Sequence, residues 1–136
     1  VYGTFQDINR VITTTIVNCI RDKKFDCSSG KQYRDFIYVE DVINAMVLAG
    51  TKKNNFVSGV YNLGTGRTAS LRQVIRGIKS SGIKVKESYS PNASVGQNSF
   101  SLDATRFKKQ FKWKPKTTLR SGIKKTLLWF QKEMTQ

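Results

Sequence analysis

The sequence predicts an α/β fold that contains about four helices and only a few strands. Apolar residues recur with the helical period in four long stretches of the chain. Short segments rich in β-branched and aromatic residues lie between them, and this alternation is typical of α/β proteins. The length of 136 residues fits a single domain. Because the strands are too few for a doubly wound sheet, we expect an incomplete architecture.

The first two helices are predicted from their apolar stripes. Residues 8–20 form the first stripe, and either Asp7 or Asn9 is available as its N-cap. The second helix carries Glu40 and Asp41 in its first turn, where the helix dipole favours negative charge. Its expected core-facing residues are Val39, Val42, Ile43, Met46 and Val47.

Two more helices and a shorter one follow. Ser70 is the expected N-cap of the third helix, and Gly82 ends it. The last helix begins at about Thr118, beyond Pro115, which a helix interior would not tolerate. A shorter helix is expected to begin at Asp103 as its N-cap. The predicted strands are Lys24–Cys27, Phe36–Val39, Gly59–Leu63 and Ile83–Tyr89, and residues 90–97 read as a surface loop.

The charge of the chain is strongly positive and unevenly distributed. The formal net charge is +15; residues 1–50 carry as many acidic as basic side chains, so the excess lies in residues 51–136. Such a field attracts polyanions and phosphorylated ligands alike. It does not distinguish between them.

Several classes of site are not expected. The chain has no histidine, and its two cysteines, Cys19 and Cys27, fall on different predicted elements, so we predict no metal site. No apolar run approaches the roughly 20 residues that span a bilayer, and no secretory signal is visible. A cytoplasmic protein with reduced thiols is the simplest interpretation.

Residues 59–69 contain a glycine pattern, GxGxxA, between a predicted strand and a predicted helix. With Glu87 following 21 residues after Gly66, the pattern outlines a dinucleotide-binding fingerprint. A tight turn uses glycine in the same way without binding anything. Since few strands accompany the motif, we favour the turn and assign no cofactor-binding residue.

Four motifs in order resemble the extended short-chain dehydrogenase/reductase family, the NAD-dependent nucleotide-sugar epimerases and dehydratases. The segment GKQYRDFIYVEDV at residues 30–42 carries most of the resemblance. Residues 1–3 (VYG), 60–66 (VYNLGTG) and 103–115 (DATRFKKQFKWKP), with the last helix, match further family elements. In that family the glycine loop belongs to a late strand of the main sheet, which also favours the turn.

The resemblance implies a C-terminal, substrate-side portion that spans residues 1–136, with an N-terminal Rossmann domain outside this chain that holds NAD or NADP. The implied activity is an isomerase or lyase reaction on a nucleotide-diphosphate sugar in carbohydrate biosynthesis. No tyrosine is followed by lysine four residues later, so the family's catalytic pair is missing and we assign no catalytic residue. We therefore expect an inactive fragment; its own N-terminal domain and a homodimer are the implied partners.

The resemblance also implies two substrate-binding residues. Arg34 aligns with a family arginine that contacts the sugar diphosphate, a role suited to a guanidinium. Asn9 stands where the family places a polar residue at the start of the helix after VYG, although a plain N-cap is an equal alternative. The family's aromatic base contact falls at Cys27, and its second arginine falls near Ala93, so the sequence supports neither of these contacts.

Two other function classes stay open. The charge would suit a basic nucleic-acid-binding module, although the aromatic residues follow apolar stripes and no nucleic-acid motif is recognisable. A non-catalytic split or remnant subunit that keeps only substrate binding is the other alternative.

Overall fold

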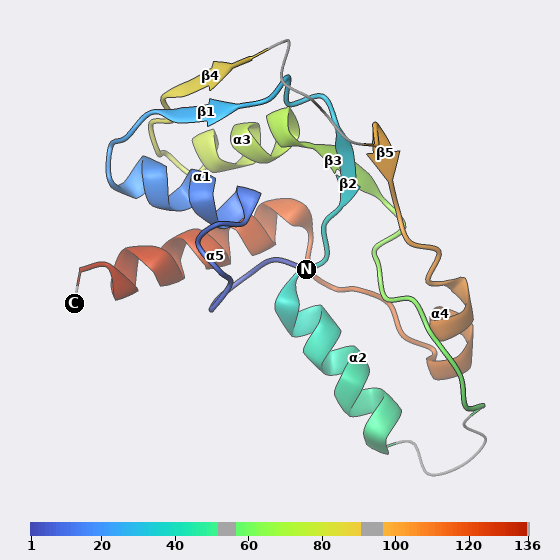
Figure 1. Ribbon diagram of the computed structural model, residues 1–136. Coiled ribbons are helices and arrows are strands. Elements are labelled where there is room, and N and C mark those ends of the chain that lie inside the picture. The colour runs from blue at the N-terminus through green and yellow to red at the C-terminus, as the bar shows by residue number, and fades with distance from the viewer. Residues whose placement is uncertain (52–56, 91–96, 136) are drawn as a thin grey trace.

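The computed structural model describes residues 1–51, 57–90 and 97–135, in which five helices and five short strands alternate (Figure 1). In chain order these elements are α1 (Val11–Ile20), β1 (Phe25–Cys27), β2 (Tyr33–Asp35), α2 (Val39–Thr51), β3 (Thr68–Ser70), α3 (Leu71–Lys79), β4 (Glu87–Tyr89), β5 (Ser99–Phe100), α4 (Thr105–Phe111) and α5 (Leu119–Glu133). The α/β prediction with few strands is confirmed.

The strands form two small sheets. β1 pairs with β4 in parallel. β2 is the centre of the other sheet, antiparallel to β3 and parallel to β5. The sheet around β2 therefore joins three segments that are far apart in the sequence: β2 itself, β3 and β5.

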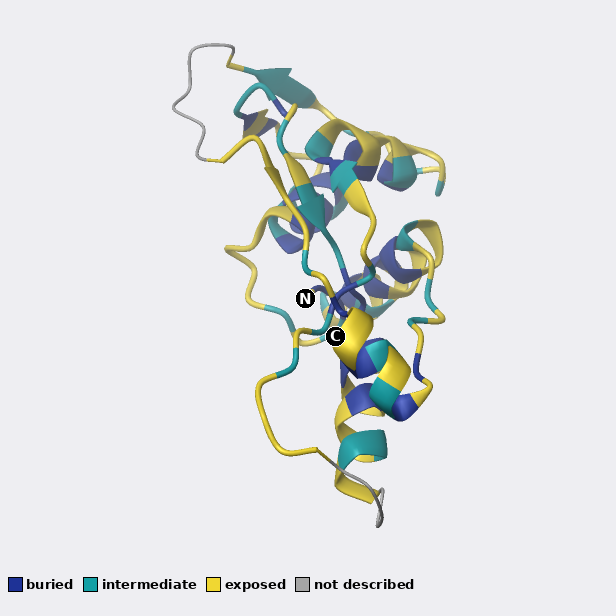
Figure 2. Ribbon diagram, turned by 90° about the vertical axis from the view of Figure 1, so that its right-hand side faces the viewer, coloured by how far each residue is buried: buried dark blue, intermediate teal, exposed yellow. Residues whose placement is uncertain are grey.

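The main core lies where α1, α3 and α5 pack together, and Figure 2 shows its buried residues on their facing sides. Ile12, Ile16, Val74, Ile78 and Ile123 are almost completely buried there. A second core joins the start of α2 to α4, where Phe107 and Phe111 stack at a centroid distance of 4.4 Å. Figure 1 shows α2 extending away from the three-helix group.

Three helix termini agree with the sequence prediction. Ser70 and Gln73 form a reciprocal capping box at α3, the arrangement that satisfies two free N–H groups at a helix start. Gly82 follows the end of α3 with a φ of +84°, which glycine adopts without strain. Thr118 caps α5 by accepting the N–H of Ser121.

The expected caps of two other helices are wrong. α1 begins at Val11 after Arg10, which makes no side-chain cap, while the Asp7 carboxylate accepts the N–H of Asn9 instead. These bonds belong to the turn before the helix. At α4 the N-cap is Ala104, and Asp103 accepts the N–H of Thr105 from one residue further out.

Two predicted strands are also wrong. Residues 36–39 do not form a strand, because Tyr38 is held by a single bridge to Tyr2 and Val39 already begins α2. Residues 59–63 pair with no strand in the described part of the chain, and the backbone becomes a strand only at β3. The strands expected at residues 24–27 and 83–89 are present in shortened form as β1 and β4.

The apolar stripe predicted on α2 is only partly directed at the core: Val42 is buried and Val39 packs against the main core, as expected. Ile43, Met46 and Val47 are exposed, whereas the buried residues of this helix are Asp41, Val42 and Ala45. Hydrophobic periodicity assigned the helix correctly, but it did not identify the face that this chain itself covers.

Candidate functional site

Arg34, the residue with the strongest prediction, lies in the middle of β2. Its backbone is opposite Ala69 of β3 and Phe100 of β5. The side chain is partly buried, and its guanidinium donates a hydrogen bond to the carbonyl of Tyr33 at 2.8 Å. A guanidinium in this position keeps further donors for a phosphate.

Asp35, the neighbour of Arg34, holds the glycine loop in place. Its carboxylate accepts the N–H of Thr65 at 3.0 Å and the N–H of Gly66 at 2.9 Å, and it also accepts the Thr65 hydroxyl. Gly66 has a φ of +74°, and a Cβ on Gly64 would lie 2.8 Å from the Asp35 carboxylate. The glycines thus lie in a tight turn whose N–H groups donate to a protein carboxylate, which agrees with a structural role for the turn.

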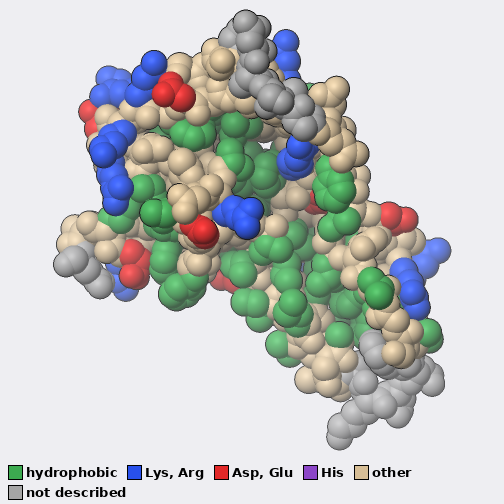
Figure 3. Space-filling model, viewed as in Figure 1, with side chains coloured by type: hydrophobic (Ala, Val, Ile, Leu, Met, Phe, Trp, Pro, Cys, Tyr) green, Lys and Arg blue, Asp and Glu red, His purple; other side chains and the backbone are tan. Residues whose placement is uncertain are grey.

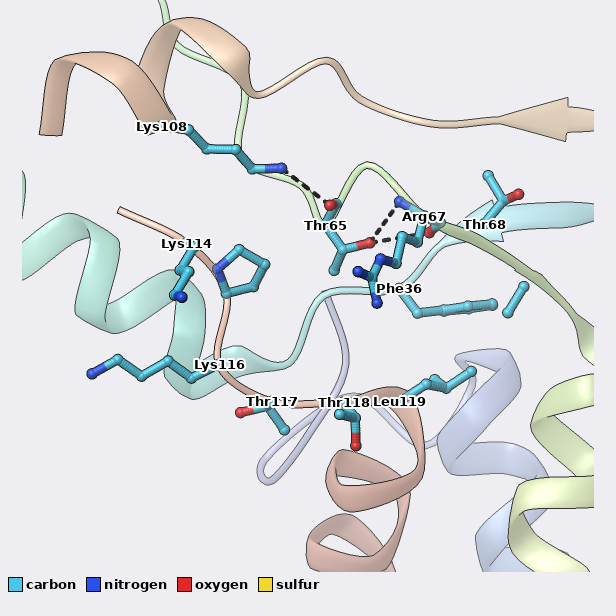
Figure 4. A pocket seen from close by; sticks show the side chains of 12 residues that line it. Phe36, Thr65, Arg67, Thr68, Lys108, Lys114, Lys116, Thr117, Thr118 and Leu119 are labelled. Atoms are coloured by element: carbon cyan, nitrogen blue, oxygen red, sulfur yellow. Dashed lines mark hydrogen bonds between the residues drawn. The ribbon is translucent and has the colours of Figure 1, made fainter. Parts of the chain in front are cut away.

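Next to this loop lies a cavity of about 480 Å³ (Figure 4). Its lining comes from Phe36, the loop and strand at Thr65, Arg67, Thr68 and Ala69, Lys108 of α4, and the run Lys114, Pro115, Lys116, Thr117, Thr118 and Leu119. Lys108 reaches across to the carbonyl of Thr65 at 3.1 Å. Four of these residues are cationic, and no acidic residue is among the described residues that line the cavity.

The second predicted site residue, Asn9, lies apart from this cavity. Asn9 is exposed in the turn before α1, and neither it nor Arg34 is among the residues that line the cavity. Neither predicted residue therefore belongs to this cavity. The segment near Ala93 lies outside the described residues.

Phe100 is a residue that the sequence analysis missed. Its backbone pairs with that of Arg34, and the residue is 47% exposed. Residues opposite each other on neighbouring strands present their side chains to the same face of a sheet. No local signal could have revealed this, because the pairing joins positions 66 residues apart.

Three of the tyrosines are less acidic than a free tyrosine. Burial raises the pKa of Tyr2, Tyr38 and Tyr89, whereas a tyrosine that gives up its proton during catalysis needs a lowered pKa. Burial likewise raises the pKa of Cys27 to about 11. No cluster of potential metal ligands occurs among the described residues.

The positive charge does not form one continuous surface on the face shown in Figure 3. Lys and Arg side chains are separated there around a hydrophobic centre. Nucleic-acid-binding surfaces typically gather their basic residues into a patch or stripe. No helix within the described residues is long and apolar enough to cross a membrane.

Comparison with known proteins identifies the class. Residues 1–64 match the sequence model of the NAD dependent epimerase/dehydratase family. A CDP-abequose synthase of Salmonella muenchen is 29% identical over 93% of this chain and 44% of its own length. The chain thus spans less than half of the curated relatives it matches, and only 27% of a UDP-arabinose 4-epimerase of Arabidopsis thaliana.

Two solved structures agree with this class. The UDP-glucose 4-epimerase of Thermotoga maritima, solved with UDP-glucose, is 30% identical with a TM-score of 0.85 over 98% of this chain and 44% of that one. The dTDP-glucose 4,6-dehydratase of Bacillus anthracis, solved with NAD, is 25% identical with a TM-score of 0.85 over 98% and 43%. The resemblance inferred from the sequence is confirmed: this chain is related to the NAD-dependent epimerases and dehydratases, and it has the fold of part of an extended short-chain dehydrogenase/reductase. The comparisons lend no support to a nucleic-acid-binding module.

Proposed function

We propose that this chain is the substrate-side portion of a nucleotide-sugar epimerase or dehydratase. Its role is to bind the diphosphate of a nucleotide-diphosphate sugar through Arg34, with Asn9 as a further polar contact. The observation that carries this proposal is the position of Arg34 at the centre of β2, directly before the Asp35 that binds the loop and opposite the exposed Phe100 of β5. A fork of guanidinium donors next to an aromatic ring suits a phosphate attached to a base.

The whole enzyme would bind NAD or NADP in a separate Rossmann domain. The chain covers less than half of its relatives, and one relative of 25% identity was solved with NAD. The exposed residues Ile43, Met46, Val47 and Val60 offer an apolar surface where such a domain can pack. Because no tyrosine has lysine four residues later, the chain by itself should give no turnover.

Calorimetric titration with UDP-glucose, UDP and uridine tests the role of Arg34. Arg34→Gln should weaken UDP-glucose and UDP binding at least about tenfold, since a charge-assisted bond to phosphate is lost, while uridine binding should change little. Arg34→Lys retains the charge but not the fork, so it should recover only part of the affinity.

Arg76→Gln on the exposed face of α3 is the matched control, because it removes the same charge away from β2. If this control weakens UDP binding as much as Arg34→Gln does, the affinity comes from net charge and the assignment of Arg34 is wrong. A loss of uridine binding in Arg34→Gln would point instead to a disturbed fold.

A further inference from the structure

Two of the segments that line the cavity beside the glycine loop have backbones held by separate carboxylates. The Asp35 carboxylate holds the loop at Thr65. The Asp41 carboxylate accepts the N–H groups of Lys116 and Thr117, each at 2.9 Å, and so holds the segment before α5. Such anchoring gives the cavity a defined shape before any ligand arrives, which lowers the entropic cost of binding.

The cationic residues of this cavity are not neutralised by carboxylates. None of the four ion pairs between described residues includes Arg67, Lys108, Lys114 or Lys116. Asp35 and Asp41 accept backbone N–H groups, and Asp103 interacts with Lys108 only through a weaker electrostatic attraction, without an ion pair. The 15-residue helix α5 adds the positive end of its dipole and has no acidic residue in its first turn. The described lining of the cavity therefore carries four positive side chains and no negative one.

The remaining lining gives the cavity a mixed character. Phe36, Pro115 and Leu119 provide apolar surface, and Thr65, Thr117 and Thr118 provide hydroxyl groups. Figure 4 shows Arg67 close to Phe36, and Lys108 directed at Thr65 on the side of the cavity that faces the Lys114–Leu119 segment. A volume of about 480 Å³ matches a small molecule rather than a polymer.

We propose that this cavity is a second anion site, distinct from the Arg34 position, which binds a small molecule carrying a phosphate or diphosphate group. Arg67, Lys108 and Lys114 balance the charge of the phosphate, and the apolar surface contacts the remainder of the molecule. This inference does not depend on the proposed function, since it rests on different residues.

Inorganic pyrophosphate is the probe, titrated into the isotope-labelled chain at low salt and followed by NMR. The expected result is saturable shifts of the Thr65, Thr118 and Leu119 amides, with an affinity that falls as salt is added. Arg67→Gln/Lys114→Gln should weaken binding at least about tenfold, because two cations are lost. The pair is chosen because it leaves the bond from Lys108 to Thr65 intact.

Two comparisons make the outcome decisive. Lys124→Gln/Lys132→Gln removes the same charge from exposed positions of α5 and should change the affinity measured at the cavity amides less than about twofold. Arg67→Lys/Lys114→Arg keeps both charges and should retain most of the binding, so a folding defect is distinguishable from a lost site. Equal weakening in the α5 control, shifts confined to the residues around Arg34, or no saturation would each overturn the proposal. If the unmodified chain binds pyrophosphate in the cavity but does not bind UDP-glucose, the proposed function is wrong and the cavity proposal stands.

Discussion

The carboxylate of Asp41 accepts the backbone N–H of Thr117 across 76 positions of sequence, and its second oxygen accepts the N–H of Lys116. Asp41 is 3% exposed and stands in the first turn of α2. One buried side chain therefore fixes the segment that leads into α5, the segment that lines the basic cavity.

Replacing Asp41 by asparagine should destabilise the chain by about 2–3 kcal/mol, because a charged acceptor of two N–H groups becomes a neutral amide with one oxygen. Urea denaturation followed by circular dichroism measures the change. The neighbouring Glu40→Gln is the control: Glu40 is exposed and pairs with Lys125 at the surface, so its loss should cost less than about 1 kcal/mol. Equal effects at the two positions would mean that Asp41 contributes through charge alone.

The close approach of Tyr2 to α5 gives a second prediction. A Cβ on Gly122 would lie 2.0 Å from the hydroxyl oxygen of Tyr2, which is 2% exposed and donates to the carbonyl of Leu119. Gly122→Ala should therefore destabilise the chain by about 1–3 kcal/mol through overpacking, measured by the same denaturation.

Gly50 provides the matched control for this substitution. It also lies in a helix, α2, but among the described residues, its chain neighbours and the nearby helix backbone apart, no atom lies within 4 Å of its added Cβ. Gly50→Ala should stabilise the chain by about 0.5–1 kcal/mol, because alanine loses less conformational entropy in a helix. A stabilising Gly122→Ala would show that the side chain of Tyr2 can move aside.

The buried face of a helix could be predicted from the sequence where other parts of the same chain pack on its apolar stripe. The stripe of α3 and the capping box at Ser70 are local patterns, and both are found as expected. The stripe of α2 is equally regular, yet Ile43 and Met46 are more than half exposed, since the described chain covers only a part of each residue. Periodicity identifies a helix, but the burial of a face depends on what lies opposite.

The strands and the site depended on pairing between distant segments. β3 and β5 are strands only because they pair with β2, and their short sequences, Thr68–Ser70 and Ser99–Phe100, carry no alternating pattern long enough to detect. For the same reason Arg34 could be predicted from its motif, whereas Phe100 opposite it could not. The basic cavity could not be predicted either, because its cationic residues are separated in a sequence that is basic throughout this region.

The thiol of Cys27 should be slow to react. It is 6% exposed, and burial raises its pKa to about 11 from a usual value of 9.0. Since the thiolate is the reactive form, a disulfide reagent at pH 8 should modify Cys27 roughly 100-fold more slowly than a free cysteine. A Cys19→Ser variant isolates the signal of Cys27; a rate that matches free cysteine would show that the β1–β4 ladder opens readily.

The same pKa predicts how stability depends on pH in alkaline solution. The folded chain retains the Cys27 proton up to about pH 11, whereas the unfolded chain releases it near pH 9. The contribution of this thiol to the free energy of unfolding is thus present below pH 9 and is lost as the pH rises towards 11. Cys27→Ser should flatten that decline between pH 9 and 11 in urea denaturation. An unchanged slope would assign the decline to other groups.

The exposed apolar face of α2 gives the last prediction. Ile43, Met46 and Val47 are 52%, 63% and 58% exposed, so the chain alone should bind a hydrophobic dye more strongly than a compact domain of similar size. Ile43→Gln/Met46→Gln/Val47→Gln should remove most of this dye signal and change the free energy of unfolding by no more than about 0.5 kcal/mol for each position.

Ala45→Gln, on the buried face of the same helix, should instead destabilise the chain markedly, because Ala45 is 0% exposed. If the triple variant is as unstable as Ala45→Gln, the three side chains support the fold, and no partner domain is needed to account for them. If the dye signal disappears while stability is kept, the apolar face is available to a partner. A Rossmann domain added in trans should then compete with the dye for the unmodified chain and fail to bind the triple variant.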